Sequence, residues 1–231
     1  MAEPARGVLD RKLAAAIDHT LLRPDADGRE VDRLCIEALR FGFAAVCVQP
    51  LWVARAARTL AGSRVGIASV VAFPHGANVT ATKVAEATRA RDDGSTELDV
   101  VANLAAVRAG EDGAVRDEIA AIARAVPGVT IKVILETTFW SPERMAAAAR
   151  AAVAGGAAFV KTSTGFTGGG ATEEAVRTLR AAVGPDIGVK ASGGIRTRAQ
   201  ALAMLAAGAS RIGASSSVSI VSDDAPGASA R

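Results

Sequence analysis

The chain has 231 residues, and half of them are apolar, which is enough for one large hydrophobic core in a single domain. The formal net charge is +3, because 24 acidic residues offset 27 basic ones. No run of Lys or Arg forms a basic stripe, and no apolar stretch reaches the roughly 20 residues of a membrane span. We therefore expect a soluble protein that binds neither nucleic acid nor membrane.

The two cysteines, Cys35 and Cys47, are too few for a disulfide framework in a chain of this length. This favours a reducing, cytoplasmic compartment. Neither His19 nor His75 has metal-ligand spacing with a cysteine or with a second histidine. We interpret both histidines as structural or solvent-facing, and we predict no metal and no cofactor.

Eight short apolar runs alternate with helical patterns along the chain. Most runs are rich in Val and Ile and lack clean polar alternation, as expected for parallel strands that are buried on both faces. The predicted strands are Ile17–Leu22, Ala44–Gln49, Val65–Phe73, Glu97–Asn103, Thr130–Glu136, Phe159–Ser163, Gly188–Ala191 and Arg211–Ala214. The predicted helices are Glu30–Phe41, Ala81–Asp93, Ala114–Ala125, Ser141–Ala154, Thr172–Val183 and Thr197–Ala207.

This alternation predicts one α/β domain over residues 1–221, a single (β/α)8 TIM barrel. The runner-up is an open doubly wound sheet, which is weaker because no G-x-G-x-x-G segment follows the first strands. Residues 222–231 are small and polar and are expected to form a disordered tail.

Charged residues stand within four consecutive predicted strands: Asp99, Lys132, Lys161 and Lys190. Barrel interiors are normally filled by branched aliphatic side chains, and a buried charge is costly unless it is paired. Any one of these lysines alone is equally well explained as a strand-end charge that reaches solvent. Four such charges on four strands instead indicate a polar site with compensating partners.

Two buried lysines on adjacent strands provide a specific chemistry. A free lysine, with a pKa of about 10.4, is protonated at pH 7 and cannot attack a carbonyl. Burial and a second cation both lower that pKa, so one lysine of the pair becomes a nucleophile for imine formation. A carboxylate such as Asp99 then moves protons. Spacing alone does not decide which of Lys161 and Lys190 is the nucleophile.

Two turns rich in glycine and serine are suited to an anion. Ser192-Gly193-Gly194-Ile195-Arg196 follows the seventh strand and opens a helix, and Gly213-Ala214-Ser215-Ser216-Ser217 follows the eighth. In (β/α)8 barrels, phosphate commonly binds at these two loops, where backbone N–H groups and hydroxyls close on its oxygens. Either turn alone is compatible with an ordinary connection, but their joint placement favours phosphate binding.

These segments together resemble the deoxyribose-phosphate aldolase family. The resemblance spans roughly Leu13 to Ser217 and rests on Ile17-Asp18-His19-Thr20-Leu21-Leu22, Glu97-Leu98-Asp99-Val100-Val101, Val160-Lys161-Thr162-Ser163-Thr164-Gly165-Phe166 and Val189-Lys190-Ala191-Ser192-Gly193-Gly194-Ile195-Arg196. It implies reversible class I aldol cleavage of 2-deoxy-D-ribose 5-phosphate to D-glyceraldehyde 3-phosphate and acetaldehyde. This is a step in carbohydrate and deoxyribonucleotide breakdown that needs no metal.

The resemblance also implies residue roles. Lys161 forms the imine, while Asp99 and Lys190 handle protons. The implied phosphate contacts are Gly165, Gly193, Gly194, Ser215 and Ser216, and the implied supporting residues are Asp18, Thr20, Lys132 and Thr162. The implied partner is a small sugar phosphate, and a homodimer is one candidate assembly. The chain departs from relatives at Gln49, where Asn is more usual, and in having no tyrosine for a closing tail.

Two alternative functions stay open at this stage. One is another phosphate-binding barrel, either a sugar-phosphate isomerase, which the paired lysines disfavour, or a different imine-forming aldolase. The other is a non-catalytic binding protein, which the intact set of Asp99, Lys161 and Lys190 disfavours. Cys47 is interpreted as a small buried hydrophobe, against the hypothesis of a reactive thiol whose pKa is lowered by nearby lysines.

Overall fold

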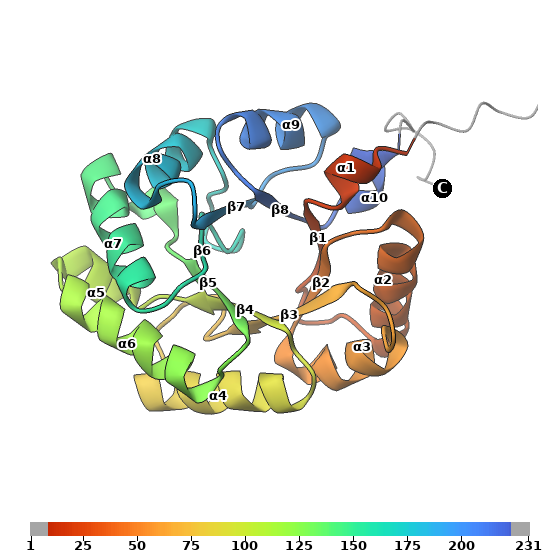
Figure 1. The fold of residues 1–231 in the computed structure, drawn as a ribbon, viewed down its shortest axis with the longest axis horizontal. Helices are drawn as coiled ribbons and strands as arrows, with labels where there is room; N and C mark the ends of the chain where they lie inside the picture. The colour runs from red at the N-terminus through yellow and green to blue at the C-terminus, as the bar shows by residue number, and fades with distance from the viewer. Residues whose placement is uncertain (1–8, 223–231) are drawn as a thin grey trace, which may run out of the picture.

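The computed structural model describes residues 9–222. Eight parallel strands pair in chain order, and β8 pairs with β1 to close a barrel (Figure 1). The strands are β1 Ile17–Leu21, β2 Ala45–Val48, β3 Gly66–Val71, β4 Glu97–Val101, β5 Thr130–Ile134, β6 Phe159–Lys161, β7 Gly188–Ser192 and β8 Arg211–Ala214. The predicted (β/α)8 fold is confirmed. The predicted tail, apart from Ser222, lies outside the described residues.

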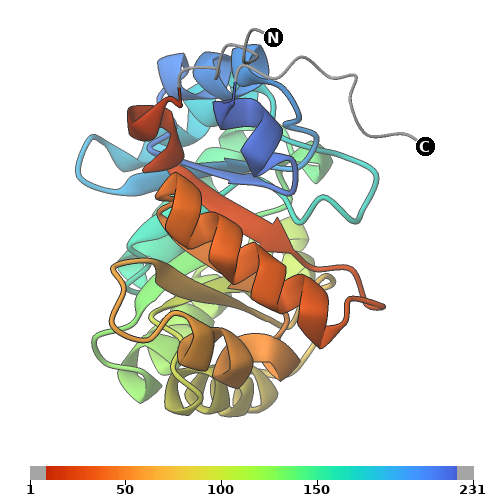
Figure 2. The ribbon, with the colours of Figure 1, turned by 90° about the vertical axis from the view of Figure 1, so that its right-hand side faces the viewer.

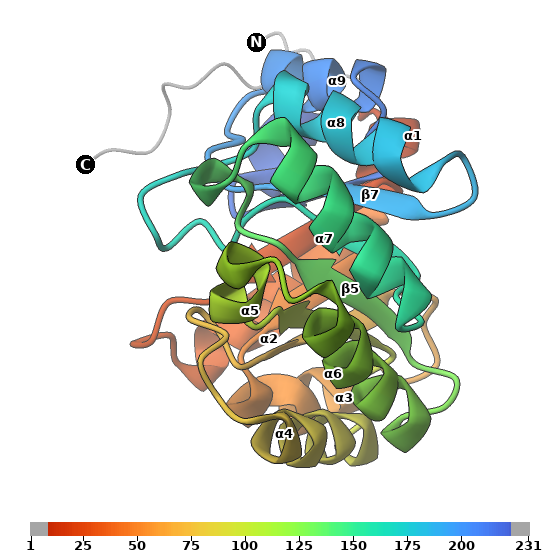
Figure 3. The same ribbon diagram turned by 90° about the vertical axis from the view of Figure 1, so that its left-hand side faces the viewer.

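Helices surround the barrel on its outside (Figures 1 and 3). They are α1 Arg11–Ala14, α2 Gly28–Phe41, α3 Val53–Thr59, α4 Thr80–Asp92, α5 Leu104–Ala109, α6 Asp112–Ala125, α7 Pro142–Ala154, α8 Glu173–Val183, α9 Arg198–Ala206 and α10 Ser217–Val221, with 3-10 turns η1 Pro50–Trp52 and η2 Thr137–Phe139. In the described part of the chain, none of these helices has the length and apolar character needed to cross a membrane.

Several of these helices were not predicted, and some strands end earlier than expected. Helix α3 lacks a side-chain N-cap hydrogen bond, so the usual start signal is missing from its sequence. Helix α5 begins beside a residue assigned to a strand, because the Asn103 side chain accepts the N–H of Ala106 and caps the helix. Strand β3 stops at Val71 because Ala72 turns out of the strand with a φ of 54°.

The main apolar core lies between the barrel and its helices. It is built from outward-facing strand residues such as Leu98, Val133 and Val189, packed against helix residues such as Ile119. The barrel interior is filled differently. Strands β2 and β3 supply small apolar side chains there, and the other strands supply charges. The interior therefore has an apolar wall facing a charged site, which strengthens the electrostatic interactions within that site.

The carboxyl ends of the strands share one end of the barrel. Figures 2 and 3 show that the loop between β1 and α2 and the loop between β6 and α8 project from that same end. Active sites of (β/α)8 barrels form at this end, from the loops that follow the strands. The fold thus brings the segment after Lys161 together with the turns after β7 and β8.

Candidate active site

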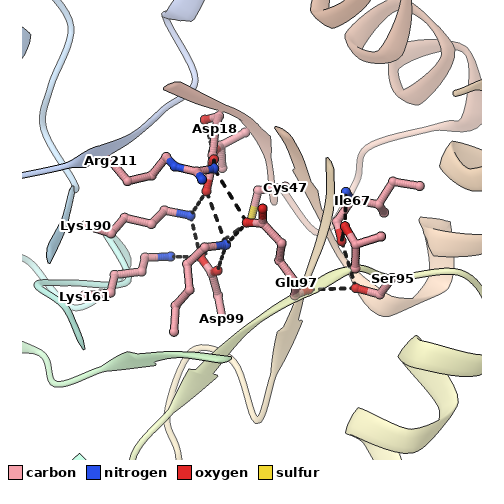
Figure 4. Close-up of polar contacts among 12 residues, drawn as sticks. Asp18, Cys47, Ile67, Ser95, Glu97, Asp99, Lys161, Lys190 and Arg211 are labelled. Atoms are coloured by element: carbon pink, nitrogen blue, oxygen red, sulfur yellow. Dashed lines mark hydrogen bonds and ion pairs between the residues drawn. The ribbon is translucent and has the colours of Figure 1, made fainter. Parts of the chain in front are cut away.

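Within residues 9–222, seven charged side chains meet inside the barrel (Figure 4). We call them the charged cluster: Asp18, Glu97, Asp99, Lys132, Lys161, Lys190 and Arg211. Register places Asp99 beside Lys132, and Lys161 beside Lys190. The predicted buried charges are confirmed, since each of these four side chains is at most 4% exposed. The alternative, lysines reaching solvent, is wrong.

Asp99 is the anion that joins the lysines. Its Oδ2 accepts hydrogen bonds from Lys161 at 2.6 Å and from Lys190 at 2.7 Å, and its Oδ1 accepts one from Lys132 at 3.0 Å. Burial alone would raise the pKa of Asp99, but the three ammonium groups outweigh burial and hold that pKa well below its ordinary value. Asp99 is therefore ionised and compensates three buried cations.

Asp18 is the second buried anion. Its Oδ2 accepts from Lys190, and its Oδ1 accepts from Arg211 at 2.7 Å. Burial would raise the pKa of Asp18, but Lys190, Lys132 and Arg211 lower it. Burial would also lower the pKa values of Lys190 and Lys132, yet the surrounding carboxylates raise both. Lys190 is thus a persistent cation on the strand beside Lys161, as the sequence argument required.

Glu97 and Arg211 complete the cluster and were not predicted. Glu97 pairs with Lys132, and its Oε2 lies 3.6 Å from a guanidinium nitrogen of Arg211. The signal for Glu97 was its position two residues before Asp99, since strand residues two apart share a face. Close packing also explains Gly213 in β8, because a Cβ there would lie 3.0 Å from Cε of Lys190.

A cavity of about 320 Å³ lies next to the cluster and is lined by the ends of β1, β6, β7 and β8 and the loops that follow them. Among the cluster side chains of the described chain, Lys161 is the one that lines this cavity. Five predicted site residues line it as well: Thr20, Gly165, Gly193, Gly194 and Ser215. The cavity has the size of a small-molecule site.

The other predicted residues lie outside the cavity lining. Asp18, Asp99, Lys132 and Lys190 lie behind Lys161 within the cluster. The hydroxyl of Thr162 donates to the carbonyl of Ser192 at 3.1 Å and accepts its N–H at 3.0 Å, so Thr162 fastens the segment after β6 to the end of β7. Ser216 immediately precedes helix α10 and does not line the cavity.

Three further residues at this end of the barrel were not named as site residues. Arg23 and Arg196 line the cavity, and Arg196 ends the segment after the seventh strand that was predicted to bind an anion. Glu136 is fully buried in a left-handed conformation with a φ of 52°. Its Oε2 accepts the Thr164 hydroxyl at 2.6 Å and the Thr164 N–H at 3.2 Å, which fixes a loop residue that lines the cavity.

Cys47 points into the barrel, where its thiol lies 3.9 Å from Oδ2 of Asp99. Burial, together with the negative charge of Asp99, raises the pKa of Cys47 to about 11. The hypothesis that nearby lysines lower its pKa is therefore wrong. The geometry fits the interpretation as a small buried side chain.

Neither histidine belongs to the site. His19 faces outward from β1, where its Nε2 lies 2.7 Å from Glu37, and His75 is exposed. Across residues 9–222, no three side chains of His, Cys, Asp or Glu gather in a way that could hold a metal ion.

Fold and site together define a (β/α)8-barrel enzyme with a buried lysine at the floor of its cavity. The model of the DeoC/LacD family aldolases matches residues 12–223. The chain belongs to this aldolase family, which confirms the family resemblance read from the sequence motifs.

Individual relatives agree with this assignment. The deoxyribose-phosphate aldolase of Brevibacillus brevis is 49% identical over 205 residues, which are 89% of this chain and 93% of that protein. The structure of a proposed deoxyribose-phosphate aldolase from Coccidioides immitis has a TM-score of 0.89 and 41% identity, covering 93% of this chain and 86% of that one. The tetrameric deoxyribose phosphate aldolase of Aeropyrum pernix has a TM-score of 0.86 and 34% identity, covering 91% and 90%. The homodimer stays a prediction for this chain.

Proposed function

We propose that this chain is a deoxyribose-phosphate aldolase that cleaves 2-deoxy-D-ribose 5-phosphate through a Schiff base on Lys161. The observation that carries the proposal is the position of Lys161. Among the cluster side chains of the described chain, it alone lines the cavity, and its amine lies 2.6 Å from Asp99. The names of the relatives supply the substrate, deoxyribose phosphate. The products, D-glyceraldehyde 3-phosphate and acetaldehyde, follow from the family resemblance.

The reaction begins when the neutral amine of Lys161 attacks the aldehyde carbon of the open-chain sugar. Loss of water leaves a protonated imine, which accepts the electron pair of the C2–C3 bond as a base removes the proton of the C3 hydroxyl. D-glyceraldehyde 3-phosphate departs, and an enamine remains. A proton returns to C2, and water then releases acetaldehyde and restores the amine.

Asp99 and Lys190 are the proposed proton-handling groups. The Asp99 carboxylate contacts both lysines, so it can pass protons between them and stabilise the positive imine. Its low pKa means that it holds a proton only transiently. Asp18 and Lys132 keep this pair in place by compensating the charges on Lys190 and Asp99.

The substrate phosphate is proposed to bind at the glycine and serine turns. Gly193 and Gly194 have φ values of 90° and 79°, a conformation that favours glycine and leaves backbone N–H groups free to approach an anion. Gly165 and Ser215 line the same cavity, and Ser216 lies beside Ser215. The exposed guanidinium of Arg196 adds positive charge at this point.

The test is turnover of 2-deoxy-D-ribose 5-phosphate, measured as formation of D-glyceraldehyde 3-phosphate in a coupled dehydrogenase assay. We expect activity in the wild type and none in Lys161→Ala or Lys161→Arg, because a guanidinium stays protonated. Lys12→Ala, on the exposed side of α1, is the matched control and should keep activity. A wild type without turnover, or an active Lys161→Ala, contradicts the proposal.

A further inference from the structure

We propose that Arg211 and Glu97, which lie at the amino-terminal ends of β8 and β4, set the pH at which Lys161 becomes a neutral nucleophile. The inference rests on the proposed function, in which Lys161 attacks the substrate. Neither Arg211 nor Glu97 lines the cavity, so they act on Lys161 through the charged cluster and not through the substrate. Arg211 and Glu97 are therefore positioning residues, because they act on the reactive amine without touching the substrate.

The charge count of the cluster is the first step. Four cations face three carboxylates among the described residues: Lys132, Lys161, Lys190 and Arg211 against Asp18, Glu97 and Asp99. With all seven groups ionised, this largely buried cluster carries one excess positive charge. Excess charge is costly where water is excluded, and the excess disappears when one cation is neutral.

The contacts identify the cation that gives up its proton. Lys190 contacts two carboxylates and Lys132 contacts three, whereas Lys161 contacts Asp99 alone within the described chain. Arg211 cannot be deprotonated in a protein. Lys161 is therefore the least compensated amine of the cluster, and it is also the one that faces the cavity.

Arg211 supplies the charge that creates this excess. Register places Lys161, Lys190 and Arg211 in one row across β6, β7 and β8. Figure 4 shows the three side chains reaching toward Asp18 and Asp99. The Arg211 guanidinium donates to Oδ1 of Asp18 at 2.7 Å, so Arg211 partly neutralises the negative charge of Asp18. Asp18 therefore stabilises the neighbouring ammonium groups less than it would without Arg211.

The remaining groups at this end of the barrel do not alter the count. Glu136 is fully buried, but its Oε2 accepts the hydroxyl of Thr164, and it forms no ion pair with the charged cluster in the described chain. Strand β2 contributes Cys47, whose pKa is raised to about 11 by burial and by Asp99, so its thiol is uncharged near neutral pH. Strand β3 has no titratable side chain. On the loops at the cavity, Arg23 is paired with Asp25 and Glu30, and Arg196 is exposed to solvent, which screens its charge.

Opposite substitutions should therefore have opposite effects. Arg211→Gln balances the cluster while Lys161 is still protonated, so the acidic limb of the kcat/KM profile should move to higher pH by about one unit. Glu97→Gln raises the excess to two charges, so the same limb should move to lower pH by about one unit. Arg211→Lys keeps the charge and should keep the wild-type midpoint.

The experiment measures kcat/KM for 2-deoxy-D-ribose 5-phosphate from about pH 5 to about pH 10, which spans the range between ordinary carboxyl and lysine pKa values. A second readout is the pH dependence of the rate at which cyanoborohydride traps acetaldehyde on Lys161, followed by mass spectrometry. Arg116→Gln removes the same charge from the exposed side of α6 and is the matched control, with no expected shift. Circular dichroism checks that each variant is folded.

Shifts in opposite directions for Arg211→Gln and Glu97→Gln support the inference. Shifts in the same direction, or unchanged midpoints in folded variants, overturn it. If Arg211→Gln does not fold, the inference is tested by Glu97→Gln alone. An acidic midpoint of the kcat/KM profile that does not move to lower pH in Glu97→Gln then overturns the inference. A wild type that is inactive and traps nothing at Lys161 instead contradicts the proposed function, which keeps the two failures distinguishable.

Discussion

The substitution Asp99→Asn removes the anion that three buried lysines share. The cluster would then hold four cations against two carboxylates, where the wild type has three. Removing one partner of a buried ion pair typically costs about 3–5 kcal/mol, because the other charge is left uncompensated. For a chain of this size, we expect a melting temperature that is lower by roughly 6–20 °C.

Differential scanning calorimetry at neutral pH measures this loss of stability. Combining Asp99→Asn with Lys132→Met leaves three cations and two carboxylates, which is the same excess of one positive charge as in the wild type. This double variant should therefore recover part of the stability that Asp99→Asn loses, and Lys132→Met alone is its control. Asp99→Asn should also lower kcat far more than it raises KM, because proton transfer is lost while side-chain shape is kept. An Asp99→Asn protein that melts at the wild-type temperature would refute the electrostatic reasoning, and an unchanged kcat would refute the proton-handling role.

Three further predictions concern the cavity and the pH dependence of stability. Ser215→Asp combined with Ser216→Asp should raise KM for 2-deoxy-D-ribose 5-phosphate sharply through charge repulsion, while activity on unphosphorylated deoxyribose falls much less; equal losses would count against a phosphate site there. Glu136→Gln should raise KM several-fold with a smaller effect on kcat, because the carboxylate that fixes Thr164 is lost, and steady-state kinetics with unchanged KM would dismiss this role. Burial lowers the pKa of His19 below 6.5, so as pH falls through 6.5 the unfolded chain takes up a proton before the folded chain does. The free energy of unfolding should therefore decrease between about pH 7 and pH 5, and urea titrations showing the same decrease in His19→Gln would contradict this cause.

The barrel strands could be predicted because buried parallel strands leave a strong local signal. Arg211–Ala214 was predicted with its observed bounds, and the other strands differ by one or more residues at their ends. Those differences arise where the backbone turns, as at Ala72, or where a residue caps the next helix, as Asn103 does. Helix α3 was missed because its seven residues are too few to show a clear helical period, and no side chain caps its start.

The centre of the site could be predicted from charges that stand in apolar strands. Lysine is especially informative in this chain, which has five lysines and 22 arginines. Four of the five lysines are buried in the structure. Glu97 and Arg211 begin their strands, where charged residues commonly reach solvent, so their inward contacts depend on barrel closure. The role of Glu136 could not be predicted from neighbouring residues, because its partner Thr164 lies in the loop between β6 and α8.

Chemical trapping identifies the lysine that forms the imine, and the proposed mechanism requires that this lysine be Lys161. The protein is incubated with 2-deoxy-D-ribose 5-phosphate, reduced with borohydride, digested and mapped by mass spectrometry. With five lysines in the chain, each candidate falls on a distinguishable segment. We predict an adduct on Lys161 that disappears in Lys161→Ala. An adduct on Lys190 alone, or no adduct in a protein that turns over substrate, would contradict the account.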